Sequence, residues 1–121
     1  MFTMRLEGGA PIYEQLERRI TELILNGEMA EGEKLPAVRE IAKQLSINPN
    51  TVQKTYANLE MMGLIYSIPA KGRYVAARDK YLDSVRGKGA AEFEEAVSHA
   101  LKQGMEKSEL IKIIQDFDEK D

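Results

Sequence analysis

The residues best suited to bind a ligand lie on one side of a short helix predicted to begin at residue 49. Apolar residues recur at helical spacing on its buried side, namely Val52, Tyr56 and Leu59. The opposite side carries three amides, one cation and one alanine: Asn50, Gln53, Lys54, Ala57 and Asn58. Asparagine and glutamine can pair with adenine through two hydrogen bonds, and lysine neutralises phosphate. This composition predicts contact with DNA; the alternative, an ordinary solvated face, would on average mix glutamate with lysine.

Asn48 followed by Pro49 marks the start of this helix. Asparagine is a favoured N-cap residue, and proline has the φ angle that the first helical position requires. An earlier helix is predicted over residues 37–45, with Ile41 and Leu45 facing inward. The turn between the two helices is short. Such a turn is typical of a helix-turn-helix, whose second helix presents its N-terminal side chains to the major groove.

β-Branched and aromatic residues over 64–68, and again over 73–75, predict two antiparallel strands joined by a turn. A hairpin directly after such a helix is a wing. Its tip is expected to carry Lys71, Gly72 and Arg73, placed to meet phosphates or a narrow minor groove. Gly72 alone is expected to supply the backbone freedom of the turn. The alternative is a plain hairpin with a solvated tip.

A first helix is predicted over residues 11–26, where Pro11 takes the first position and Gly27 follows the end. The residues of its apolar stripe are Ile12, Leu16, Ile20, Leu23 and Ile24. At the start of the next helix, Ala37 offers no side-chain oxygen to cap the backbone. The missing cap forfeits about 1 kcal/mol.

Together these features resemble the GntR family of bacterial transcription regulators over residues 10–75. The motifs that carry the resemblance are Pro11-Ile12-Tyr13, Gly27, Gly32, Leu35-Pro36, Arg39-Glu40, Asn50-Thr51-Val52, Leu59-Glu60, Gly63-Leu64-Ile65 and Gly72. The run at 48–51, followed by a short helical tail, is most similar to the YtrA-type subfamily. The resemblance implies a winged helix-turn-helix that binds DNA and regulates transcription as a repressor. It also implies control of a neighbouring transporter operon.

The resemblance also points to particular DNA-binding residues. Arg39 matches the family's DNA-contacting arginine, with an exposed ion pair as the local alternative. Pro49 stands where many members place an arginine that reaches guanine, so base reading must fall on its neighbours. Those neighbours are Asn48, Asn50, Thr51 and Gln53. Capping is expected to engage Asn48, and Lys54 is expected to anchor phosphate.

Helical patterns return over residues 79–86, 90–103 and 107–119, with a break predicted at the glycines of 87–89. Such short helices are marginal as an isolated unit. Helix-turn-helix proteins usually dimerise so that two helices reach successive major grooves. Residues 78–121 are therefore predicted to form a dimer seam, the alternative being a tail folded back onto its own winged helix. The predicted seam residues are Tyr81, Val85, Phe93, Val97, Leu101, Leu110, Ile114 and Phe117.

Charge is distributed unevenly along the 121 residues, whose net charge is −3. Residues 1–33 carry a net charge of −4, residues 34–89 carry +6 and residues 90–121 carry −5. Attraction to phosphate depends on the local field within about a Debye length, about 10 Å at 0.1 M salt. The basic middle segment, which contains the helix-turn-helix and the hairpin, is therefore the part expected to meet DNA.

Several other classes of protein are excluded by what the sequence lacks. No cysteine occurs, which excludes disulfides and thiol chemistry and suits a reducing cytosol. No apolar run approaches the roughly twenty residues of a membrane span, so a cytoplasmic protein without membrane contact is expected. His99 is the only histidine, so no metal or cofactor is expected. An enzyme is not expected either, because phosphate loops and catalytic triads are absent, and Glu94 and Glu95 diverge by about 100° on a helix.

The sequence thus predicts a mainly α-helical chain with a small β-hairpin. Residues 10–77 form a winged helix-turn-helix DNA-binding domain, and residues 78–121 form a short helical dimerisation segment. The protein is expected to act as a homodimer on a pseudo-palindromic operator in double-stranded DNA. A small-molecule effector at the dimer interface stays open, because nothing in the sequence identifies one. The alternative function is a winged helix that contacts a protein or a structured RNA.

Overall fold

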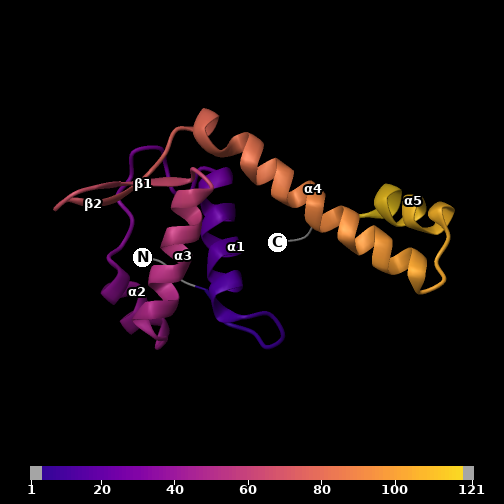
Figure 1. Ribbon diagram of the computed structural model, residues 1–121, viewed down its shortest axis with the longest axis horizontal. Helices are drawn as coiled ribbons and strands as arrows, with labels where there is room; N and C mark the ends of the chain where they lie inside the picture. Colours follow the sequence, from indigo (N-terminus) through magenta and orange to yellow (C-terminus); the bar gives the residue numbers. More distant parts are fainter. Residues whose placement is uncertain (1–3, 119–121) are drawn as a thin grey trace. The chain divides into compact units, whose positions relative to one another are not determined.

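The computed structural model describes residues 4–118 and is mainly α-helical, with one two-stranded antiparallel sheet, as predicted (Figure 1). In chain order the elements are α1 (Ile12–Leu25), α2 (Val38–Leu45), α3 (Pro49–Met61), β1 (Ile65–Ile68), β2 (Gly72–Val75), α4 (Arg78–Lys102) and α5 (Lys107–Asp116). The chain divides into two compact units, the first ending at Ser84 and the second beginning at Val85. Each unit is described separately below.

The core of the first unit is built by α1, α2 and α3. Figure 1 shows α1 and α3 side by side. Leu16 and Ile20 of α1 are buried, and so are the three predicted core residues of α3: Val52, Tyr56 and Leu59. Full burial of each large apolar side chain stabilises the fold by about 1.5–3 kcal/mol. The helical spacing of these residues therefore fixes which side of α3 faces inward and which side faces solvent.

The turn between α2 and α3 has the predicted helix-turn-helix form. Ser46 ends α2 in the left-handed conformation, at a φ of 57°. Asn48 caps α3, because its side-chain Oδ1 accepts a 2.8 Å hydrogen bond from the Asn50 backbone N–H. Pro49 occupies the first helical turn, as expected. At the start of α1, Pro11 is the N-cap and Ile12 is the first helical residue, so the helix begins one position later than predicted.

The hairpin is part of a wider set of strand-like pairings. β1 and β2 pair antiparallel, with Tyr66 opposite Tyr74 and Ser67 opposite Arg73. On its other edge β2 pairs with the segment before α2, where Leu35 N–H donates to the Arg73 carbonyl at 2.8 Å. The prediction that Gly72 alone frees the turn is wrong. Ala70 also has a positive φ, of 64°, because the tight turn needs two left-handed residues and only one of them is glycine.

The beginning of α4 is packed against the end of α3. Gly63 has a φ of +86°, and a side chain there would collide with the Lys80 carbonyl oxygen, so only glycine fits. The Ser84 hydroxyl donates to the Met62 carbonyl across the same contact. Tyr81, predicted in the dimer seam, is instead buried, with 4% of its surface exposed. Its aromatic ring is therefore already covered within its own chain.

A single helix replaces the two helices predicted after the hairpin. The break at Gly87 and Gly89 does not occur, and α4 continues from Arg78 to Lys102. Glycine destabilises a helix by about 1 kcal/mol relative to alanine but keeps the backbone hydrogen bond, so good helix formers on both sides can carry the helix through. The last helix ends at Asp116, with Phe117 as its C-cap, rather than at residue 119, which lies outside the described residues.

The second unit is a helical hairpin made by the later part of α4 and by α5. Gly104, at a φ of +97°, turns the chain, and Met105 N–H donates to the Ala100 carbonyl. The most buried side chains of this hairpin are only half-buried: Val85, Val97, Ala100, Leu101, Met105 and Leu110. Among residues 85–118 no side chain is fully buried. The hairpin therefore lacks the closed core that a stable isolated unit requires.

The N terminus of α2 holds half of a capping box and yields a stability test. Glu40 accepts the Ala37 backbone N–H at 3.2 Å, but Ala37 offers no side-chain oxygen in return. Ala37→Ser should add the missing half, about 1 kcal/mol, and raise the Tm by about 4–8 °C in circular dichroism or calorimetry. Ala91→Ser, at an exposed position inside α4, is the control and should give no gain. An unchanged or lower Tm for Ala37→Ser would show that α2 is capped in another way.

Candidate nucleic-acid interface

The exposed face of α3 is narrower than the sequence predicted. Asn50, Gln53, Lys54 and Ala57 are exposed. Asn58, predicted beside them, turns instead toward α1, where its Nδ2 donates to Glu17 Oε2 at 3.3 Å. Glu17 is only 5% exposed, so this amide satisfies a buried carboxylate and is not available to DNA. The exposed face therefore holds two amides and one cation.

Lys54 is held at one edge of this face. Its Nζ lies 3.9 Å from the centroid of the Tyr13 ring, a cation–π contact between α3 and α1. At an exposed site such a contact contributes about 0.5–1 kcal/mol. Thr51 is half-buried, and the neighbouring Thr55 hydroxyl donates to the Tyr13 carbonyl at 3.3 Å. The position of the Lys54 charge is thus set by the first helix as well as by α3.

Two predicted DNA-binding residues of the helix-turn-helix remain to be described, Arg39 and Asn48. Arg39, in the first turn of α2, is exposed. Asn48 is also exposed, but its side-chain oxygen accepts the capping hydrogen bond, as predicted. Pro49 beside it is exposed and offers no donor.

Arg73 does not lie at the tip of the hairpin. Residues 69–71 form the tip, because Ile68 pairs with Gly72 and Ser67 pairs with Arg73. Strand side chains alternate between faces, so Arg73 lies on the same face as the buried Val75. Its guanidinium carbon lies 5.3 Å from the centroid of the Tyr56 ring. Its Nε is buried and has no hydrogen-bond partner among the described residues.

Tyr56 links this arginine to the core. Its hydroxyl donates to the Pro36 carbonyl at 2.7 Å. Burial raises the pKa of Tyr56 far above its ordinary value; the Arg73 charge lowers it in part and Glu40 raises it further. The hydroxyl therefore stays protonated and remains a donor throughout the physiological pH range.

A groove of about 430 Å³ joins the face of α3 to the hairpin. It is lined by Gln53, Ala57, Glu60, Met61 and Arg73. Glu60, the first carboxylate on α3, accepts a 2.8 Å hydrogen bond from the Ser67 hydroxyl of β1. This contact ties the hairpin to α3. The amide face and the half-buried arginine thus border one continuous depression, with Lys71 exposed at the hairpin tip.

Three features of this surface were not predicted from the sequence, although a sequence pattern indicates one of them. The two-residue alternation of a strand, counted back from Val75, places Arg73 on the inner face. The Glu60–Ser67 hydrogen bond and the Lys54–Tyr13 contact join elements distant in sequence. No local pattern marks either of them.

The comparison with protein families decides the identity of this fold. The family described as "Bacterial regulatory proteins, gntR family" matches residues 12–75. The chain belongs to the GntR family. It is a DNA-binding transcription regulator with a winged helix-turn-helix, not an enzyme, as predicted.

Two relatives from Bacillus subtilis refine this assignment. The chain is 32% identical to the uncharacterized HTH-type transcriptional regulator YhcF over 116 residues, covering 95% of this chain and 96% of YhcF. It is 46% identical to the HTH-type transcriptional repressor YtrA over 70 residues, which cover 58% of this chain and 54% of YtrA. The GntR regulator is therefore of the YtrA type.

Solved structures agree with the fold. A GntR family transcriptional regulator from Listeria monocytogenes superimposes with a TM-score of 0.75 at 29% identity, covering 93% of this chain and all of that chain. The DNA-binding domain of AraR in complex with operator ORR3 superimposes with a TM-score of 0.54 at 28% identity. That alignment covers 63% of this chain and 92% of the AraR domain.

The predicted seam residues of the second unit fall into two groups. Val85, Val97, Leu101 and Leu110 are half-buried. The other three are exposed: Phe93 by 53%, Ile114 by 55% and Phe117 by 73%. Phe93, Val97, Leu110 and Ile114 lie along an almost wholly apolar groove of about 440 Å³. His99 is exposed near the end of α4.

Two further observations concern membranes and metals. No described helix is both long enough and apolar enough to cross a membrane. Within residues 4–118, no three histidine or acidic side chains come together as a metal site.

The Glu60–Ser67 hydrogen bond provides a test of how the hairpin is held. Ser67→Ala removes the donor and should speed hydrogen exchange of the amides in residues 65–75 about two- to twelvefold, because one exposed hydrogen bond contributes about 0.5–1.5 kcal/mol. The Tm should change by only a few degrees. Ser98→Ala, at an exposed site in the second unit, is the control. Unchanged exchange in the hairpin would mean that the other strand pairings hold it without Glu60.

Proposed function

We propose that this GntR regulator is a cytoplasmic homodimeric repressor that binds a pseudo-palindromic operator, and that the operator controls a transporter operon. Residues 10–77 would form the DNA-binding domain and residues 78–121 the dimerisation segment. The observation that carries the proposal is the amide-bearing face of α3, continuous with the groove beside the hairpin. The repressor named YtrA among the relatives supports the sign of regulation.

The roles of individual residues follow from their positions. Asn50, Thr51 and Gln53 would lie nearest the base edges, because they are at the beginning of α3. Arg39 and Lys54 would anchor phosphate or guanine. In the hairpin, Lys71 and Gly72 would meet the DNA backbone or the minor groove, and Arg73 would reach DNA only through the groove. The AraR domain in complex with its operator supports a shared mode of docking.

The second unit supports the dimer. Its residues 85–118 contain no fully buried side chain, yet Phe93, Ile114 and Phe117 are more than half exposed. Phe93 and Ile114 line one apolar groove, and large exposed apolar groups of this kind favour burial against another protein surface. A second copy of the same segment offers a matching apolar surface, and two-fold symmetry would bring two α3 helices to successive major grooves.

Selection of bound sites from a pool of random duplex DNA tests the function as a whole. The expected result is an enriched site with two inverted half-sites about 10 base pairs apart, or a multiple of this distance. Tighter binding to a structured RNA hairpin than to any selected duplex would favour the alternative function. Enrichment of a single half-site would contradict the dimeric part of the proposal.

The salt dependence of duplex binding tests the phosphate contact of Lys54. The logarithm of the association constant should fall linearly with the logarithm of the salt concentration, and Lys54→Ala should make this slope shallower by about one. Tyr13→Phe is a matched control, because it keeps the ring beneath Lys54 and should keep the wild-type slope. An unchanged slope for Lys54→Ala would remove Lys54 from the list of DNA contacts.

Analytical ultracentrifugation tests the dimer. The wild type should sediment as a dimer at tens of micromolar, and Ile114→Asp should produce monomers, since a charge cannot be buried unpaired in an apolar seam. Because Ile114 is 55% exposed, the substitution should leave the Tm of the first unit unchanged. Ser98→Asp, at an exposed polar site of α4, should remain dimeric. A monomeric wild type at this concentration would overturn the proposed seam.

A further inference from the structure

Lys34 belongs to the hairpin in space although it precedes α2 in sequence. The segment around it pairs with the free edge of β2 through an isolated bridge: Gly32 N–H donates to the Val75 carbonyl at 2.8 Å, and Val75 N–H donates to the Glu33 carbonyl at 2.9 Å. Lys34 itself is bridged antiparallel to Tyr74. Its backbone is therefore fixed at the edge of the hairpin by hydrogen bonds on both sides.

The side chain of Lys34 lies on the outer face of this small sheet. The next residue, Leu35, is buried at 3% exposure, and alternation along a strand places Lys34 on the opposite face. Tyr74 is directly across from it, and the Tyr74 ring stacks on Tyr66 at 5.8 Å between centroids. This face is the reverse of the one on which Arg73 approaches Tyr56.

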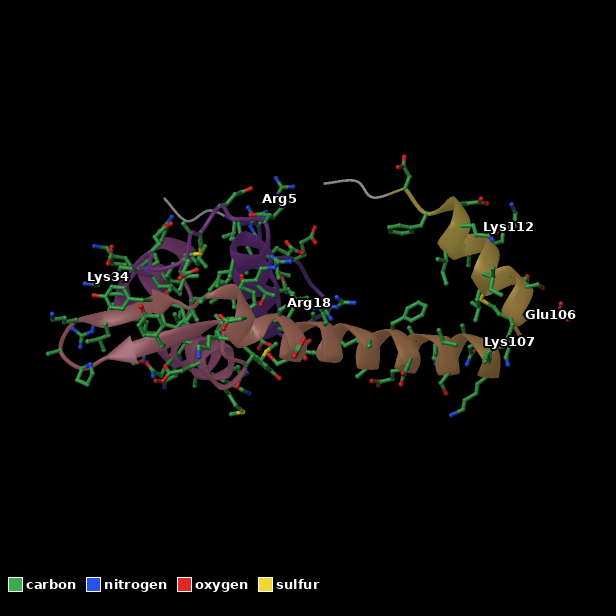
Figure 2. The ribbon with its side chains drawn as sticks, turned by 90° about the horizontal axis from the view of Figure 1, so that it is seen from above. Arg5, Arg18, Lys34, Glu106, Lys107 and Lys112 are labelled. Carbon is green, nitrogen blue, oxygen red and sulfur yellow. The ribbon has the colours of Figure 1, made fainter. Side chains whose placement is uncertain are left out.

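Because Gly72 has no side chain, the Lys34 side chain can extend past it toward the hairpin tip. A Cβ at Gly72 would lie 2.8 Å from Lys34 Cε and 3.6 Å from its Nζ, so the lysine stem passes over the position that a side chain would fill. Gly72 is the diagonal neighbour of Lys34 across the pairing. Figure 2 shows Lys34 on the side of the first unit where the hairpin ends. The Lys34 side chain therefore extends along β2 toward the turn that contains Lys71.

The charge of Lys34 is available to a partner. The side chain is exposed, and no carboxylate within residues 4–118 forms an ion pair with it. Lys71 is exposed at the adjoining tip. Two exposed ammonium groups, Lys71 at the hairpin tip and Lys34 beside β2, favour a phosphate backbone over any neutral partner.

We propose that Lys34 is a DNA-binding residue that contacts a backbone phosphate next to the one met by the hairpin tip. The proposal rests on the proposed function, in which α3 and the hairpin dock on duplex DNA. In this arrangement Gly72 has two roles. It adopts the φ of +132° that the turn requires, and its lack of a side chain lets the Lys34 stem lie flat on the hairpin. The contact is sequence-independent, because a phosphate carries no information about the base.

Titration of a labelled mixed-sequence duplex of about 30 base pairs tests the contact, with the full-length protein and Lys34→Gln. The variant should bind with a salt slope shallower by about 0.9. Between about 50 and 200 mM salt the wild type should then lose about 3.5-fold more affinity than the variant. Lys34→Arg keeps the positive charge and should retain the wild-type slope. Lys102→Gln, an exposed lysine of the second unit, is the matched control and should also retain it.

A second readout does not depend on affinity. Acetylation of lysine amines, followed by mass spectrometry, should show Lys34 and Lys71 protected by the duplex and Lys102 equally reactive with and without it. An unchanged slope for Lys34→Gln, or a Lys34 amine as reactive in the complex as in the free protein, would overturn this inference alone. A wild type that fails to bind the duplex at low salt would overturn the proposed function and the Lys34 contact together.

Discussion

The burial of one side of α3 against α1 and α2 is the constraint on which the rest of the structure depends. Val52, Tyr56 and Leu59 are almost completely removed from solvent, and together they fix the rotation of the helix about its own axis. A rotation of one residue, about 100°, would bring polar groups inward and expose the core. Every later feature follows from this orientation, including which amides face solvent and where the hairpin meets the helix.

A second set of contacts transfers that orientation to the hairpin. Tyr56 reaches from the core to the Pro36 carbonyl with its hydroxyl and lies beneath Arg73 with its ring. Glu60 holds β1 through Ser67. The segment before α2 completes the sheet by pairing with β2. The surface that joins the exposed face of α3 to the hairpin is therefore assembled from three places in the sequence, each of which contacts α3.

The parts of this arrangement that sequence could predict are the local ones. They include the start of α3 at Pro49, the Asn48 cap and the core stripe of α3. Each depends on neighbours within one or two helical turns, so periodicity and capping rules predict it directly. The inward position of Arg73 was within reach of the same rules. The placement of Lys34, Lys54 and Asn58 was not, because each is set by a partner on another element. The glycines of α4 were misread for a different reason: their helix propensity is poor, but the surrounding residues outweigh it.

The turn of the hairpin has an energetic consequence. Ala70 holds a left-handed backbone, which for a residue with a Cβ is less stable by about 1–2 kcal/mol than the right-handed form. The turn sequence by itself thus opposes closure, and the strands close because β2 is hydrogen-bonded along both edges and β1 is hydrogen-bonded to α3 through Ser67 and Glu60. The hairpin consequently depends on its surroundings: an isolated two-stranded hairpin is at best marginally stable in water, and the strained turn at Ala70 would weaken it further once the helices were removed.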